Sequence, residues 1–79
     1  MLNMIEQVLE IFIEVTGNDE IAEDLDLNLF DAGLLDSLAI IEVLLQIEEK
    51  LGMKLQPTDL EREDMSTVNK LAEFLENRK

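Results

Sequence analysis

The sequence predicts an all-α protein, a bundle of three main helices plus one short helix, with a long loop between the first and second main helices. Apolar residues recur at helical spacing in three segments, and each segment is bounded by residues that suit helix caps. The strand-like alternation of residues 25–29 has no second strand pattern to pair with. With 79 residues, the chain is expected to form a single domain over residues 1–79.

The first helix is expected over about residues 3–16. Asn3 and Glu6 fit a capping box, in which each side chain satisfies the backbone N–H of the other residue. Gly17 followed by Asn18 supplies a stop. The residues expected on the buried face of this helix are Ile5, Val8, Leu9, Phe12 and Thr16.

The second helix is expected from Ser37 to Leu51, with Gly52 as its stop. Its core stripe consists of Ile40, Val43, Leu44, Ile47 and Leu51. A second stripe consists of Leu38, Ile41, Glu42, Leu45, Glu48 and Glu49. This second stripe begins beside Ser37 and mixes apolar with acidic side chains, so it is the candidate face for binding partner proteins. The alternative is that its apolar members pack under neighbouring helices or the long loop.

The third main helix is expected over about residues 67–77, with Ser66 or Thr67 as its N-cap. The apolar stripe of this helix consists of Val68, Leu71, Ala72 and Leu75. A short helix is expected near residues 58–64. Its start is predicted by Thr58 and Glu61, which suit a second capping box.

Residues 18–36 are expected to form an extended loop whose leucines plug the helical core. A connection of this length is usually functional in a compact domain. Asp24 to Asn28 match the opening of a calcium-binding EF-hand loop, but Leu29 replaces the required glycine and Leu35 replaces the bidentate glutamate. We therefore expect no metal site here, and at most a loose attraction of divalent cations to a solvated acidic loop, formed by Asp19, Glu20, Glu23, Asp24 and Asp26.

Composition excludes several classes of function. The chain has no cysteine and no histidine, so it cannot build a disulfide, a Ser-His-Asp triad, a Cys-His pair or a zinc site alone. We therefore expect no catalytic residues and no enzyme activity. A net charge of −13 disfavours nucleic acid and anionic lipid and favours basic protein surfaces. Without a signal peptide or membrane span, the protein is expected in the cytoplasm and not inserted in the membrane.

The segment from Asp31 to Leu38 contains the candidate site. Gly33 permits a turn, and Ser37 then lies at or next to the first residue of the second helix. In one interpretation, Asp36 or Ser37 is only an N-cap, although neither completes a capping box. In the other, the Ser37 hydroxyl is an attachment point, because a helix N-terminus stabilises a phosphodiester. No base in this chain activates that hydroxyl, so a partner enzyme would have to transfer the phosphoryl group.

Asp36-Ser37-Leu38, followed by an acidic amphipathic helix in a small acidic chain, resembles the acyl and peptidyl carrier protein family. The resemblance covers essentially the whole chain and implies an acyl-carrier-like bundle. It also implies that Ser37, flanked by Asp36, receives 4'-phosphopantetheine covalently from coenzyme A through a phosphopantetheinyl transferase. The chain would then be a monomeric, non-catalytic carrier that holds an acyl group as a thioester.

Within this family the sequence most resembles the D-alanyl carriers of teichoic acid D-alanylation. The stretches that carry this likeness are Asn18 to Glu20, Gly33 to Ser37, Leu44 to Glu49 and Glu61 to Asp64. The sequence departs from that pattern at Leu38, where phenylalanine is common, and at Met65, where an aromatic residue is usual. The likeness implies loading by a D-alanine-activating ligase and delivery through a membrane-bound O-acyltransferase to (lipo)teichoic acid. Two alternatives stay open: a fatty-acid or polyketide carrier, and a helical interaction module that carries no prosthetic group.

Overall fold

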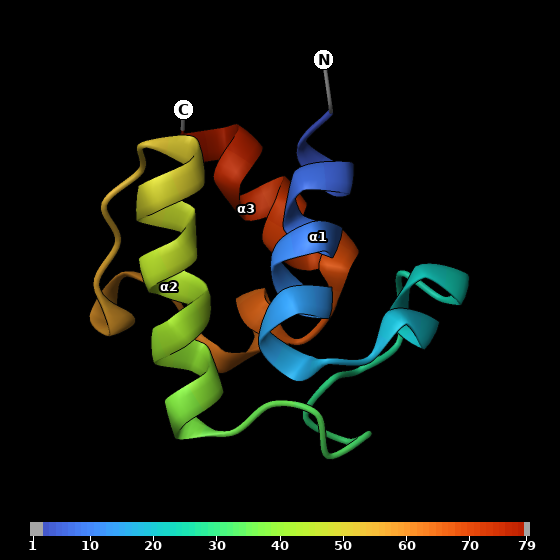
Figure 1. Cartoon of the computed structure of the whole chain (residues 1–79). Helices are drawn as coiled ribbons and strands as arrows, with labels where there is room; N and C mark the ends of the chain where they lie inside the picture. Colours follow the sequence, from blue (N-terminus) through green and yellow to red (C-terminus); the bar gives the residue numbers. More distant parts are fainter. Residues whose placement is uncertain (1–2, 79) are drawn as a thin grey trace.

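The computed structural model describes residues 3–78, which form three α-helices and three short 3-10 helices (Figure 1). In chain order these are α1 (Met4–Thr16), η1 (Asp19–Glu23), α2 (Ser37–Leu51), η2 (Pro57–Asp59), η3 (Arg62–Met65) and α3 (Val68–Arg78). No strand occurs within residues 3–78, which confirms the predicted all-α class. None of the described helices is both long enough and apolar enough to cross a membrane.

The three main helices begin and end within two residues of the predicted bounds, because their caps are local features of the sequence. The Asn3 side-chain oxygen accepts a 2.8 Å hydrogen bond from the backbone N–H of Glu6, which starts α1. Gly17 and Gly52 end α1 and α2 in the left-handed conformation. At the start of α3, the Thr67 hydroxyl accepts a 3.0 Å hydrogen bond from the backbone N–H of Lys70.

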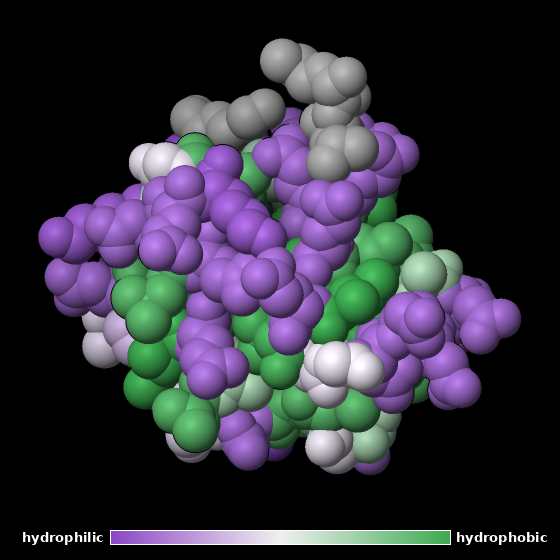
Figure 2. Space-filling view, in the orientation of Figure 1, coloured by the Kyte–Doolittle hydropathy of each residue, from purple (hydrophilic) through white to green (hydrophobic). Residues whose placement is uncertain are grey.

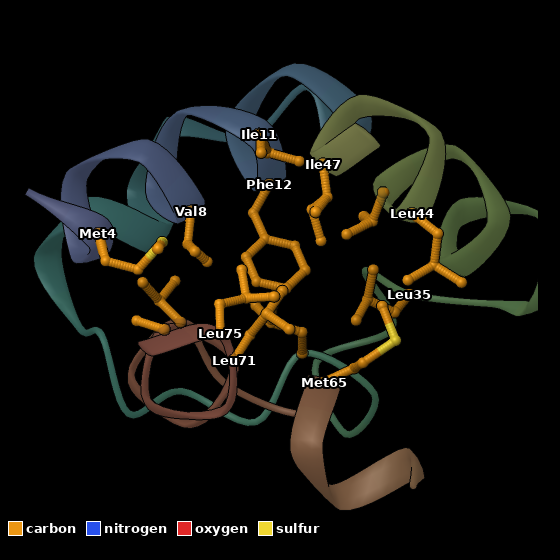
Figure 3. Close-up of a cluster of buried hydrophobic side chains, with 14 of the residues drawn as sticks. Met4, Val8, Ile11, Phe12, Leu35, Leu44, Ile47, Met65, Leu71 and Leu75 are labelled. Carbon is orange, nitrogen blue, oxygen red and sulfur yellow. The ribbon is translucent and has the colours of Figure 1, made fainter. Parts of the chain in front are cut away.

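The core lies where the three α-helices meet, and Phe12 occupies its centre. Figure 3 shows the ring of Phe12 pointing from α1 into the space between α2 and α3. Phe12 and Ile47 are fully buried, and so are Leu71 and Leu75. The predicted stripe of α3 is confirmed in full, since Val68, Leu71, Ala72 and Leu75 are all buried. On α2, Val43, Leu44 and Ile47 are buried, whereas Ile40 and Leu51 are half-buried against the core.

The predicted buried face of α1 is partly wrong. The residues buried on this helix are Met4, Val8, Ile11 and Phe12, whereas Ile5 is 38% exposed and Leu9 is half-buried. Both sets satisfy helical spacing, so periodicity alone could not choose between them. The observed face is turned toward Ile11 because α1 packs against both α2 and α3.

The single short helix predicted near residues 58–64 is not confirmed in that form, and its predicted capping pair differs from the observed caps. The chain instead forms the two separate 3-10 turns η2 and η3, between which Leu60 is extended. The backbone N–H of Gln56 donates to a carboxylate oxygen of Asp59 at 2.9 Å. The N–H of Glu61 donates in the same way to Asp64 at 3.0 Å. Each carboxylate thus caps the start of its own short turn, and the predicted pair of Thr58 with Glu61 is not used.

The long first connection is tied to the rest of the molecule at Leu29. This residue is fully buried, and its backbone N–H donates to the carbonyl of Ser66 at 2.7 Å. Leu25 and Leu27 are half-buried against the core, so the prediction that leucines plug it holds fully for Leu29 and partly for these two. The sequence did not predict η1, which begins where the Asn18 side chain accepts from the N–H of Glu20.

Candidate functional site

The start of α2 separates the roles of two adjacent polar residues. Asp36 is the N-cap, because its side-chain oxygen accepts a 2.8 Å hydrogen bond from the backbone N–H of Ala39. Ser37 is the first residue of the helix and is exposed, and its hydroxyl has no hydrogen-bond partner within residues 3–78. Of the two candidates for the cap, Asp36 therefore fills it and leaves the Ser37 hydroxyl available for chemistry.

The loop before α2 is held in a fixed turn. The Asn28 side-chain oxygen accepts from the backbone N–H groups of Phe30 and Asp31, both at 3.0 Å. Gly33 follows with φ of 75°, a left-handed conformation that glycine adopts without strain, as the sequence predicted. Leu35 then enters the core, where Figure 3 shows it near Met65. With Leu35 anchored, Ser37 is positioned at the surface two residues later.

Ser37 lies at the edge of a surface hollow of about 330 Å³. The hollow forms because the connection that follows α2 runs back along this helix, so that η2 and η3 approach its first turns (Figure 1). Most of its lining is apolar, and its lining residues besides Ser37 are Ile40, Ile41, Pro57, Leu60, Glu61, Arg62 and Met65. A group attached to Ser37 would therefore meet an apolar surface with one acidic and one basic side chain.

The second stripe of α2 is exposed. Leu38, Ile41 and Leu45 are 67%, 47% and 56% exposed, and these large apolar side chains are not covered by neighbouring elements. The acidic members Glu42, Glu48 and Glu49 are exposed as well. In Figure 2, hydrophobic surface is visible over the lower half of α2, beneath hydrophilic surface that spans the upper part of the molecule. The alternative that this stripe packs under other parts of the chain is therefore wrong for its exposed leucines and isoleucine.

The acidic loop serves local structure. An Asp24 carboxylate oxygen accepts from the backbone N–H of Asp26 at 3.1 Å, and Asp26 in turn accepts from the side-chain amide of Asn69 at 2.8 Å. Among residues 3–78, no group of three or more acidic side chains has an arrangement that could hold a metal ion.

One residue pair near the site was not assigned by sequence reasoning. The guanidinium of Arg62 lies over the ring of Phe30, with its central carbon 4.1 Å from the ring centroid. Arg62 begins η3 and lines the hollow beside Ser37, whereas Phe30 belongs to the loop that leads into α2. The two residues are far apart in the sequence, so no local motif could have indicated the contact.

Comparison with known proteins identifies the kind of site. Residues 6–75 match the family model described as the phosphopantetheine attachment site. A D-alanyl carrier protein from Lactococcus lactis subsp. lactis is 40% identical over 76 residues, which cover 96% of each chain. D-alanyl carrier proteins from Enterococcus faecalis and Bacillus cereus are both 39% identical, over 95% and 90% of this chain and 96% and 90% of theirs. The chain belongs to the family of D-alanyl carrier proteins. For this carrier, covalent 4'-phosphopantetheine is therefore the prosthetic group, as the sequence indicated.

The residues at the start of α2 fit such a group. The exposed Ser37 hydroxyl is not used as a cap, and the first helical turn presents backbone N–H groups that stabilise a phosphodiester. The adjoining hollow offers apolar surface to the aliphatic part of the arm. When bound, the arm supplies a thiol at the end of a long flexible chain, where an acyl group can be held as a thioester.

Proposed function

We propose that this protein carries D-alanine as a thioester on a 4'-phosphopantetheine arm attached to Ser37, for transfer to (lipo)teichoic acid. The observation that supports Ser37 most directly lies at the start of α2. There the Asp36 side chain caps the helix, and the Ser37 side chain is exposed. Membership of the D-alanyl carrier family supports D-alanine as the cargo.

Ser37 acts as the nucleophile when the arm is attached. Its Oγ forms a bond to phosphorus in coenzyme A, the pyrophosphate bond breaks, and 3',5'-ADP leaves. The hydroxyl proton is expected to pass to a base on the phosphopantetheinyl transferase, because this chain has no histidine and the neighbouring Asp36 carboxylate is used as the helix cap. The carrier's own contribution is a rigid mount, since the cap and the anchored Leu35 fix where the hydroxyl lies.

The partner enzymes in this proposal are the transferase, a D-alanine-activating ligase and a membrane-bound O-acyltransferase. The carrier would meet each of them as a cytoplasmic monomer through the exposed stripe of α2, formed by Leu38, Ile41, Glu42, Leu45, Glu48 and Glu49. Apolar side chains bordered by glutamates suit enzyme surfaces that are both hydrophobic and basic. The tether then raises the effective concentration of the thioester in each active site.

A small cargo also agrees with how the bundle is filled. A fatty-acid carrier must shelter a long acyl chain between its helices, whereas an alanyl group can stay in water. A long acyl chain would have to enter the centre of the bundle. The fully buried ring of Phe12 lies there (Figure 3). This observation favours D-alanine over the alternative of a fatty-acid or polyketide cargo.

The attachment site is tested by intact-mass measurement after incubation with a phosphopantetheinyl transferase and coenzyme A. The wild type should gain one arm, and Ser37→Ala should gain none. Thr58→Ala is a matched control, because Thr58 carries another exposed hydroxyl and belongs to η2. This variant should still be modified. Modification of Ser37→Ala would show that the site is elsewhere, and an unmodified wild type would favour the plain interaction module.

The cargo is tested on the arm-bearing protein. It is offered D-alanine and ATP with the cognate ligase, and separately malonyl-coenzyme A with a fatty-acid malonyl transferase. We expect efficient D-alanyl loading. Malonyl loading without D-alanyl loading would overturn the choice of cargo and leave the carrier function standing.

A further inference from the structure

Arg62 is held close to an aromatic ring without a carboxylate partner within residues 3–78, a combination that the paired lysines and Arg78 do not have. The chain has only 6 lysines and arginines against 19 acidic residues. Three of the basic side chains form ion pairs within residues 3–78: Lys50 with Glu14, Lys70 with Glu63, and Arg78 with Asp59. Neither Lys54 nor Arg62 forms such a pair within these residues, but only the Arg62 guanidinium of these two lies over an aromatic ring, that of Phe30. A cation in this acidic protein is thus held in place without being neutralised by a carboxylate.

The position of Arg62 connects it with Ser37. Both residues line the hollow of about 330 Å³ between the first turns of α2 and the η2–η3 segment. The turn that presents Arg62 is fixed by the hydrogen bond from the N–H of Glu61 to Asp64. Phe30 is fixed in turn, because its backbone N–H donates to Asn28. Phe30 belongs to the connection before α2 and Arg62 to the connection after it. The position of the guanidinium is therefore fixed by both connections, which meet beside Ser37.

The lining of the hollow matches the first part of a phosphopantetheine arm. That part is a phosphodiester, which keeps a negative charge, followed by a carbon that bears two methyl groups. Ile40, Ile41, Leu60 and Met65 offer apolar surface for the methyl groups. The negative charge would be repelled by Asp36 at the cap and by Glu61 in the hollow unless a cation offsets them.

We propose that Arg62 is a positioning residue for the arm, and that its guanidinium pairs with the phosphodiester at Ser37. The inference rests on the proposed function, in which Ser37 bears the arm. Arginine suits this role because its planar, weakly hydrated fork matches phosphate oxygens. Held in this way, the root of the arm lies along the hollow, and the thiol end stays free to reach partner enzymes.

The test compares apo and arm-bearing forms by NMR, with ¹⁵N in the arm and ¹³C in the methyl groups of the protein. In the wild type, attachment of the arm should shift the methyl signals of Ile41 and Met65, and the first amide of the arm should be more ordered than the second. Arg62→Gln should reduce both effects, since an exposed ion pair changes the ratio of held to free arm by about two- to fivefold. Arg62→Lys should fall between the two.

Lys70→Gln is the matched control. It removes the same charge from a side chain that is paired with Glu63 and does not line the hollow, so the arm should behave as in the wild type. Equal arm dynamics in wild type and Arg62→Gln would overturn the role of Arg62, and so would an equal loss in Lys70→Gln. Intact mass separates this failure from a failure of the proposed function, because in the second case no arm-bearing form is obtained at all.

Discussion

The two faces of α2 contain similar residues but differ sharply in exposure. Leu44 and Leu45 are neighbours of the same type, yet Leu44 is 5% exposed and Leu45 is 56% exposed. Their surroundings differ because Leu44 packs into the core, whereas more than half of the Leu45 side chain is open to solvent within residues 3–78. Hydrophobicity alone therefore does not determine where a leucine lies here, since its angular position on the helix decides whether it packs in the core or stays exposed.

The difference has an energetic side. A leucine that becomes fully buried on folding contributes about 1.5–3 kcal/mol to stability, whereas an exposed one contributes little. Val43, Leu44 and Ile47 thus hold α2 on the bundle. The exposed Leu38, Ile41 and Leu45 cost little to retain and are available to be buried against another protein.

The largest expected effect is on the inner face. Leu44→Asp should destabilise the fold by at least about 3 kcal/mol, because it removes core packing and places a carboxylate where it lacks partners. In a protein of this size such a loss leaves little or no stability. Circular dichroism during thermal or urea unfolding measures it. A variant that retained the unfolding midpoint of the wild type would show that Leu44 is not a core residue.

On the outer face, the neighbouring Leu45→Asp and the variant Ile41→Asp should leave the fold nearly unchanged. Both should instead slow D-alanyl loading, by about tenfold in kcat/KM if these side chains are central to the interface. Loading assays on the arm-bearing variants, with unfolding midpoints measured in parallel, separate the two effects. Unfolding caused by Ile41→Asp would mean that the outer stripe belongs to the core.

The same contrast between fold and function is expected at the start of the helix. Asp36→Ala removes the side chain that caps α2 and should cost about 1 kcal/mol of stability. Ser37→Ala should cost almost nothing, since the serine makes no capping hydrogen bond. Urea unfolding of the two apo variants tests this difference. If Ser37→Ala proved the more destabilising, the assignment of the cap to Asp36 would be wrong.

Local features of the sequence allowed the helices, and the position of Ser37 at the start of α2, to be predicted. Asn3, Gly17 and Gly52 mark helix ends whose hydrogen bonds span only a few residues, so the pattern determined the structure directly. The outer stripe was likewise predictable, because helical spacing separates it from the core stripe.

Features that depend on tertiary packing could not be predicted in this way. The choice between Ile5 and Ile11 as a buried residue of α1 depends on where α2 and α3 lie. The segment around Leu60 has the composition of a helix but is held as two turns by its aspartates. The contact between Phe30 and Arg62 joins two connections that only the folded chain brings together.

The smallest expected effect concerns the charge that the outer surface carries. A net charge of −13 in one small protein opposes its compact state, and salt screens this repulsion. Glu48 and Glu49 add to it, because they lie near the C-terminal end of α2, where the helix dipole is also negative. Raising the ionic strength should therefore increase stability by roughly 0.5 kcal/mol, or about 2–4 °C in Tm.

The double variant Glu48→Gln, Glu49→Gln should be more stable than the wild type at low salt and should respond less to added salt. Thermal melts in sodium chloride at low and high ionic strength measure both quantities. A Tm that stayed constant or fell in high salt would show that repulsion among the exposed acids does not limit stability, and the outer face would then bear its charge without cost to the fold.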